Sequence, residues 1–194
     1  MRIRISTLLA IQATQLGSWI SLAAAEPQGD GPACHPRPTC AQQAASSKWV
    51  VEGFDYHAEY IFTTPAHQNS HGYVNFQLWN TAVAYTATCS ATSDQLTDFF
   101  YGTQWYPCTL PSTALAGSDV SFRFNRPTGE LDVKGTIMCA ENGQGAAAVF
   151  PAEGTTQLTL TCTDTTWTNP NWTYGTGEFY SDREVKCVPD TCVF

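Results

Sequence analysis

The stretch YVNFQLW at residues 73–79 alternates apolar and polar side chains one by one. Successive side chains of an extended chain point to opposite faces, so Val74, Phe76 and Leu78 share one face. Asn75 and Gln77 then lie on the other face. This period of two is typical of an antiparallel strand with one buried side.

The same pattern recurs along most of the chain. Further strands are expected at 49–55, 56–62, 83–90, 120–125, 131–139 and 158–163, with short ones at 178–180 and 184–188. Turn residues separate them, notably at 65–72, 127–129 and 169–171. We therefore predict an all-β fold, a compact antiparallel β-barrel or sandwich stabilised by disulfides. Its core should contain Trp49, Phe76, Phe122 and Phe124.

At most one short helical turn is expected, at 93–100. Ser93 is placed to cap it, and Leu96, Phe99 and Phe100 would pack inside it.

The first 25 residues have the order of a secretory signal peptide. Arg2 and Arg4 precede an apolar stretch, and three alanines at 23–25 precede Glu26. Polar residues interrupt the apolar stretch, which disfavours a retained membrane anchor. We expect a signal peptide at 1–25, an extended Pro- and Gly-rich N-terminal arm at 26–47 and a single β-barrel domain at 48–194, secreted to the extracellular space.

The chain is acidic, and its basic residues are scattered along the sequence. Seventeen acidic and nine basic residues give a net charge of −8. Loss of Arg2 and Arg4 with the signal peptide would make the net charge −10. Electrostatic binding to nucleic acid or to an anionic membrane is therefore disfavoured.

All eight cysteines follow residue 25, and in an oxidising compartment they predict up to four disulfides. A structural zinc site is disfavoured because no Cys-x-x-Cys pair occurs. The triplet Asn171-Trp172-Thr173 is an acceptor for N-glycosylation, a second indication of secretion.

Catalytic and metal-binding patterns are weak. His57, His67 and His71 are the best metal candidates, but His67 and His71 fall in the expected turn at 65–72, where solvated side chains are the simpler interpretation. Carboxylate side chains occur close together in the sequence at three places, but sequence spacing does not show whether any two face each other as a catalytic pair. They are Asp94 with Asp98, Glu52 with Asp55 and Glu59, and Asp182 with Glu184. No nucleophile, nucleotide or cofactor motif appears, so we predict a non-enzyme without catalytic residues, cofactor or metal.

Aromatic residues gather near the end of the chain. Trp167, Trp172, Tyr174 and Tyr180, together with Phe179, lie among Gly, Asn and Thr residues. Exposed rings there form a candidate ligand surface for a glycan, a small aromatic molecule or a protein partner. The alternative is that most of these rings cap one end of the barrel.

One segment is more specific than a fold class. Cys89-Ser90-Ala91, the Asp-x-Leu at 94–96 and Trp105-Tyr106-Pro107-Cys108 stand in an order and spacing that resemble the Alternaria major-allergen family (the Alt a one group), small secreted fungal proteins. The resemblance covers residues 49–139. It implies a compact β-barrel with a disulfide between Cys89 and Cys108. Cys40 is the best match in this sequence to the N-terminal cysteine that can link two subunits in the family. A disulfide-linked homodimer is therefore a candidate.

The other cysteines are less constrained. Cys139 and Cys162 both face inward in their strand patterns, so we take them as the next pair. Cys34, Cys40, Cys187 and Cys192 are further disulfide candidates without assigned partners.

The resemblance implies a function without catalysis. It implies an allergen-like effector or elicitor that acts in fungal virulence by provoking or blunting plant defence. Such proteins bind host extracellular defence proteins or, in some cases, small phenolic ligands. The Trp- and Tyr-rich tail favours an alternative, a secreted carbohydrate-binding module or small glycoside hydrolase. A wall-associated structural protein is a third interpretation.

Overall fold

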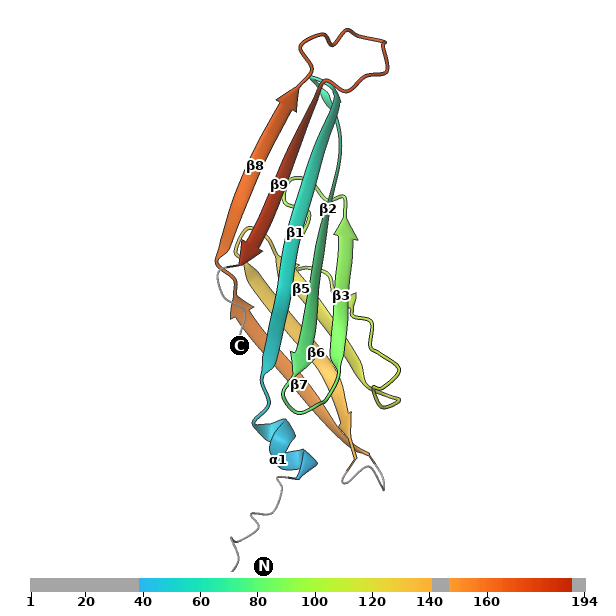
Figure 1. Cartoon of the computed structure of the whole chain (residues 1–194), viewed down its shortest axis with the longest axis vertical. Coiled ribbons are helices and arrows are strands. Elements are labelled where there is room, and N and C mark those ends of the chain that lie inside the picture. The colour runs from blue at the N-terminus through green and yellow to red at the C-terminus, as the bar shows by residue number, and fades with distance from the viewer. Residues whose placement is uncertain (1–38, 141–146, 190–194) are drawn as a thin grey trace, which may run out of the picture. The chain divides into compact units, whose positions relative to one another are not determined.

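The computed structural model describes residues 39–140 and 147–189 (Figure 1). The chain divides into two units, Met1–Pro36 and Arg37–Phe194, and the first lies outside the described residues. The predicted signal peptide at 1–25 and the first part of the predicted arm also lie outside them.

The described residues form one short helix and nine strands in two antiparallel sheets. The five-stranded sheet has the order β3-β2-β1-β9-β8, and the four-stranded sheet has the order β4-β5-β6-β7. The elements are α1 (Cys40–Ala45), β1 (Trp49–Thr64), β2 (His67–Asn80), β3 (Thr86–Ser93), β4 (Tyr106–Pro107), β5 (Asp119–Asn125), β6 (Glu130–Cys139), β7 (Ala148–Gln157), β8 (Leu160–Thr168) and β9 (Ser181–Pro189).

The two sheets face each other through a buried aromatic core. Phe54 of β1 lies 5.6 Å from Phe76 of β2 and 5.2 Å from Phe124 of β5, measured between ring centroids. Phe76 also meets Phe122 edge-on at 4.8 Å. Trp49 is buried with them, so the four expected core residues are confirmed. The predicted all-β class is confirmed as well, in the form of a sandwich of two open sheets.

The strands at the start of the chain are longer than expected. The two predicted strands at 49–55 and 56–62 are one strand, β1, with a bulge between Glu52 and Asp55. Gly53 has a φ of 62° there, a conformation that glycine adopts without strain. The expected turn at 65–72 is wrong beyond residue 66, because β2 begins at His67 and pairs with β1 along its length.

The helix prediction is wrong in its position. Residues 40–45 of the expected extended arm form α1, where Thr39 and Gln42 make a reciprocal capping box. Residues 94–100 form an irregular loop, because hydroxyl groups of β1 bind its carbonyls: Tyr60 donates to Thr97 at 2.8 Å and Tyr56 donates to Asp98 at 3.3 Å.

That loop covers part of the five-stranded sheet with two aromatic rings. Phe99 and Phe100 are fully buried, and the Phe99 ring lies 5.3 Å from Tyr60. Leu96, which we expected to pack inside the turn, is 52% exposed.

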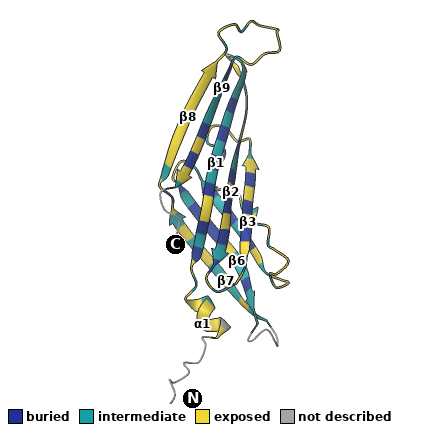
Figure 2. Ribbon diagram, viewed as in Figure 1, coloured by how far each residue is buried: buried dark blue, intermediate teal, exposed yellow. Residues whose placement is uncertain are grey.

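β8 is unlike the other strands because both of its faces are open. It is an edge strand that pairs only with β9, and every residue after Leu160 is exposed (Figure 2). Its threonine content therefore reflects an exposed strand, in agreement with the strand interpretation of this segment. The loop that follows β8 lies at the same end of the sheet as the β1–β2 turn (Figure 1).

Candidate functional site

The loop between β8 and β9, residues 169–180, is held in place at both ends. The Asn169 amide donates to the Tyr180 carbonyl at 2.9 Å, and the Tyr180 amide donates to Phe62 of β1 at 2.8 Å. Inside the loop, the Trp172 indole donates to the Glu178 carbonyl at 3.1 Å. We name this loop together with Trp167 the aromatic tip.

Large apolar side chains are exposed on the aromatic tip. Tyr174 is 87% exposed, Trp167 55% and Phe179 50%. Rings that are exposed side by side on an otherwise polar surface commonly mark a place where another molecule binds.

A shallow cleft of about 340 Å³ opens in the aromatic tip. Trp167 and Phe179 supply its apolar walls, and Glu178 and Asn169 supply polar groups. The Asn169 side-chain amide donates to the Glu178 carboxylate at 3.1 Å, which orients both groups. The cleft thus combines two aromatic rings with a carboxylate and an amide.

The predicted ligand surface separates into two parts. Trp172 packs edge-on against Tyr180 at 5.5 Å and Tyr174 at 6.5 Å, so it supports the loop. Trp167 instead lines the cleft with Phe179. The sequence pattern gave no signal for Asn169 or Glu178, because only the folded loop brings them beside Trp167.

Asn171 lies in the same loop and is exposed. Its amide donates to the Asn169 side-chain oxygen at 3.0 Å, a local turn that leaves the Asn171 side chain outward. N-glycosylation at this residue stays a prediction.

The disulfides correct one predicted pair. Cys89 is joined to Cys108, the pair that the family resemblance implies. Cys162 is joined to Cys187, so the predicted Cys139–Cys162 pair is wrong. Cys162 and Cys187 stand opposite each other on β8 and β9, whereas Cys139 ends β6 of the other sheet. Cys139 is itself disulfide-bonded. Cys34 and Cys192 lie outside the described residues, and Cys40 is the first residue of α1.

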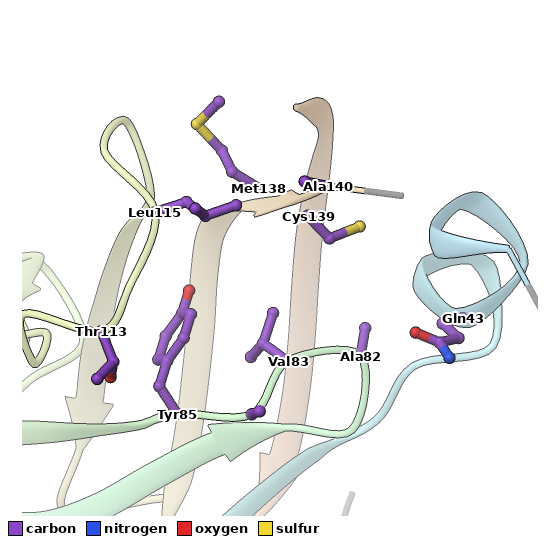
Figure 3. Close-up of a pocket in the computed structure, with 10 residues that line it drawn as sticks. Gln43, Ala82, Val83, Tyr85, Thr113, Leu115, Met138, Cys139 and Ala140 are labelled. Carbon is purple, nitrogen blue, oxygen red and sulfur yellow. The ribbon is translucent and has the colours of Figure 1, made fainter. Parts of the chain in front are cut away.

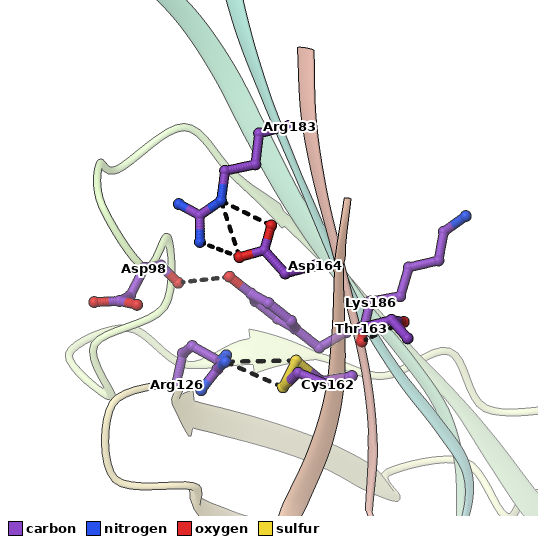
Figure 4. Close-up of a disulfide and its surroundings, with 9 residues drawn as sticks. Asp98, Arg126, Cys162, Thr163, Asp164, Arg183 and Lys186 are labelled. Carbon is purple, nitrogen blue, oxygen red and sulfur yellow. Dashed lines mark hydrogen bonds and ion pairs between the residues drawn. A yellow bond between two sulfur atoms is a disulfide. The ribbon is translucent and has the colours of Figure 1, made fainter. Parts of the chain in front are cut away.

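Two arginines lie beside β8 and β9 next to this disulfide (Figure 4). Arg126 lies 5.1 Å from the Tyr56 ring centre and places its guanidinium 3.3 Å from the sulfur of Cys162. Arg183 lies 5.1 Å from the Tyr60 ring centre and forms an ion pair with Asp164 of β8. Burial raises the pKa of the Tyr56 hydroxyl, which therefore stays protonated as a hydrogen-bond donor.

His67 and His71 lie on β2, which corrects their expected turn position, and His57 lies on β1, where a strand was expected. His57 contacts Tyr73 at 2.6 Å and Glu184 at 2.9 Å, on the outer face of the five-stranded sheet. A hydrogen bond from Lys186 lowers the pKa of Glu184. His71 pairs with Glu59 at 3.3 Å. The partners of His57 differ from the partner of His71, and the described part of the chain holds no group of three or more side chains able to bind a metal ion.

No helix within residues 39–140 and 147–189 has the length and apolar character needed to cross a bilayer.

The protein-family model described as Alternaria alternata allergen 1 matches residues 51–187. The match spans both described disulfides and all nine strands of the described part, apart from a few terminal residues. No curated protein and no solved structure matches the chain. Family and disulfides are consistent with a secreted protein. The resemblance found at residues 49–139 is confirmed, and the chain belongs to the Alternaria alternata allergen 1 family.

Proposed function

We propose that this protein is a secreted fungal effector or elicitor that binds a host extracellular defence protein without catalysis. The observation that carries the proposal is the aromatic tip, where Trp167 of β8 is exposed together with Tyr174 and Phe179 of a loop that is hydrogen-bonded to β1. Aromatic anchors of this kind supply most of the free energy in many protein interfaces. Family membership supports the allergen-like, disulfide-stabilised character of the protein.

Charge supports the same proposal. A chain with 17 acidic and nine basic residues attracts basic partners at low ionic strength, and the attraction weakens as salt screens it. The expected partner is therefore a basic protein, recognised by aromatic contacts and drawn in by charge.

Capture from host extracellular fluid tests this proposal. The immobilised protein should retain one defined host protein at low salt, and less of it at high salt. Trp167→Ala with Tyr174→Ala should weaken that binding by about tenfold or more. Val149→Ala is the matched control, because Val149 is 57% exposed on β7 of the other sheet. The proposal would be contradicted if the intact protein, the double variant and the Val149→Ala control all retained the host protein equally. It would also be contradicted if no host protein bound in a salt-sensitive way.

The cleft supports a second candidate, binding of a glycan. Trp167 and Phe179 can pack against the C–H faces of a sugar ring while Glu178 and Asn169 bind its hydroxyl groups. A glycan array with the intact protein and with Trp167→Ala, Phe179→Ala tests it. Unchanged or absent signals would remove this candidate. If it is correct, enzymatic removal of glycans from the host fluid should abolish capture, which a protein partner would survive.

Two further parts of the proposal concern assembly and small ligands. A homodimer linked through Cys40 should run at twice the monomer mass on a gel without reductant and at the monomer mass with it. A small aromatic or phenolic ligand is the other partner class that we propose.

A further inference from the structure

The Cys162–Cys187 disulfide joins an exposed cysteine to a buried one. Cys187 of β9 is fully buried, whereas Cys162 lies on the edge strand β8 and is exposed. The bond crosses from β9 to β8, because the two residues stand directly opposite each other. None of the described strands pairs with the far side of β8. A molecule in solution can therefore approach the Cys162 sulfur from the side that faces away from Cys187.

A guanidinium group contacts both sulfur atoms of this disulfide. Nη2 of Arg126 lies 3.3 Å from Sγ of Cys162 and 3.4 Å from Sγ of Cys187 (Figure 4). The Tyr56 ring supports the guanidinium, with its centre 5.1 Å away. Arg126 takes part in none of the ion pairs within residues 39–140 and 147–189. Its positive charge is therefore directed at the two sulfurs and is not shared with a carboxylate of the described chain.

The other described cysteines with a disulfide have different surroundings. Cys89 and Cys108 pack against the buried core, and no side chain of the described residues donates a hydrogen bond to their sulfurs. Cys139 lines a pocket of about 380 Å³ whose described lining residues are all uncharged (Figure 3). A cation against the sulfurs is thus a particular feature of Cys162–Cys187.

This arrangement favours thiol–disulfide exchange. In that reaction a thiolate attacks one sulfur of a disulfide, and the other sulfur leaves as a thiolate. A positive charge beside the leaving sulfur stabilises its thiolate form and so speeds the reaction. In this protein the accessible sulfur belongs to Cys162, and the sulfur that would leave, that of Cys187, lies beside the guanidinium.

We propose that Cys162–Cys187 is an exchange site at which an external thiolate opens the disulfide. The attacking sulfur bonds to Sγ of Cys162, the bond between Cys162 and Cys187 breaks, and its electron pair leaves with Cys187 as a thiolate beside Arg126. A second external thiolate attacks the first external sulfur and releases Cys162 as a thiolate. The protein disulfide is thereby reduced by two electrons, two external thiols are oxidised to one disulfide, and the two cysteine thiolates take up protons from water.

Exchange at this disulfide places the aromatic tip under the control of thiols. β8 leads into the tip, and after exchange it keeps its pairing with β9 and the Asp164–Arg183 ion pair but loses its covalent link. The tip is then attached to a looser strand, so its exposed rings are less well fixed for binding. This consequence rests on the proposed function, whereas the exchange reaction does not.

Rates of opening test the exchange site. The folded protein is treated with dithiothreitol, quenched with acid at intervals, labelled with N-ethylmaleimide and mapped by peptide mass spectrometry. Cys162 and Cys187 should become available to the label about tenfold faster than Cys89 and Cys108. Equal rates at the two disulfides, or faster opening of Cys89–Cys108, would overturn the proposal.

Variants of Arg126 separate the effect of its charge from that of exposure. Arg126→Gln should slow the opening of Cys162–Cys187 about tenfold, the value of one charged hydrogen bond, and Arg126→Lys should recover most of the rate. Loss of fold speeds opening, so the predicted slowing is not a result of destabilisation. An opening rate in Arg126→Gln that equals or exceeds that of the intact protein would overturn the proposal.

Lys186→Gln is the matched control, because it also removes one positive charge from the neighbourhood of the disulfide. Lys186 is adjacent to Cys187 on β9, so its side chain points to the opposite face of the sheet, where it pairs with Glu184 at 3.0 Å. Its opening rate should stay within about twofold of the intact protein's rate. An equal slowing in Lys186→Gln and Arg126→Gln would show a general effect of charge and overturn the role of Arg126.

Glutathione identifies the attacked sulfur. In samples quenched early with acid, the glutathione adduct should lie on Cys162 and the maleimide label on Cys187, and the reverse distribution would overturn the proposal. Reduced thioredoxin at the same thiol concentration distinguishes the source of the thiol: faster opening than with glutathione indicates a redox protein, and slower opening a small thiol. Opening by neither would overturn the proposal. Because no host protein is present, failure of the exchange and failure of host-protein capture are distinguishable.

Discussion

Asp132 is a buried carboxylate on β6 that the fold keeps charged. Its side chain accepts hydrogen bonds from Arg123 and from the Thr155 hydroxyl, both at 2.6 Å. Burial acts to raise the pKa of Asp132, but the hydrogen bonds from Thr155 and Arg123 outweigh burial, and the pKa is lowered below 3.8. The folded state therefore holds a carboxylate that the unfolded chain protonates more readily.

This difference predicts how Asp132 contributes to acid stability. Because the folded pKa is the lower one, the contribution is complete above about pH 4 and is lost as the pH falls through the folded value. Asp132→Asn should lower the free energy of unfolding at neutral pH and flatten its decrease below pH 4. Urea unfolding at a series of pH values measures both effects. Asp119→Asn, at an exposed position on β5, is the control and should keep the intact protein's slope.

At the scale of elements, few contacts hold β8 in the five-stranded sheet. It pairs with β9 alone, and the side-chain links between the strands include the Cys162–Cys187 disulfide and the ion pair of Asp164 with Arg183. Nothing in the core covers β8, since its residues after Leu160 are exposed. The disulfide is therefore the strongest single restraint on the strand that leads into the aromatic tip.

Removal of that disulfide should loosen β8 first. The chain-entropy relation predicts that Cys162→Ala, Cys187→Ala lowers the free energy of unfolding by about 3.5 kcal/mol, since the cysteines are 25 residues apart. Amide hydrogen exchange followed by mass spectrometry should show the largest gain in β8 and the aromatic tip. Cys89→Ala, Cys108→Ala is the comparison, because its sequence separation of 19 predicts a similar loss of stability. Equal gains in β8 from both variants would contradict this assignment.

The elements also show what the sequence could and could not predict. β5 and β6 were predictable because Phe122, Phe124 and Val133 alternate with polar residues, although Asp132 on the polar face of β6 is also buried. β7 was missed because Pro151 and Gly154 interrupt its pattern and none of its side chains is fully buried. Its strand conformation comes from pairing with β6 along its whole length, which no local pattern encodes.

The site divides in the same way. Exposed aromatic residues near residue 170 were predictable from composition, because Trp and Tyr stand there among Gly and Asn residues without the alternating pattern of a strand. The cleft was not, because Glu178 and Asn169 join Trp167 only through the loop's hydrogen bonds. The Cys162–Cys187 pair was missed because the pattern indicates the direction of a side chain and not the strand that lies beside it.

At the scale of the whole described unit, the aromatic core joins the two sheets. Phe122 of the four-stranded sheet contacts Phe76 of the other sheet at 4.8 Å and Tyr106 at 5.6 Å. Phe122 is fully buried. Rings shared between the sheets make the stability of one sheet depend on the other.

Phe122→Ala should therefore weaken the whole sandwich. The expected loss is about 3–5 kcal/mol in the free energy of unfolding, the usual cost of a large-to-small substitution in a core. Tryptophan fluorescence and far-ultraviolet circular dichroism should report the same midpoint, since both sheets unfold together. Leu115→Ala, at a residue 42% exposed, is the control and should cost much less. Separate midpoints in the intact protein would show that the sheets unfold independently.

The openness of β8 also affects how an antibody would recognise the molecule. A strand with one buried face offers only every second side chain to a binding partner. β8 exposes eight residues in a row, so its surface follows the order of the sequence. A short peptide of residues 160–168 carries the same side chains in the same order, and an epitope on β8 is therefore a continuous one. On strands with a buried face, an epitope combines residues from neighbouring strands and is lost when the fold is lost.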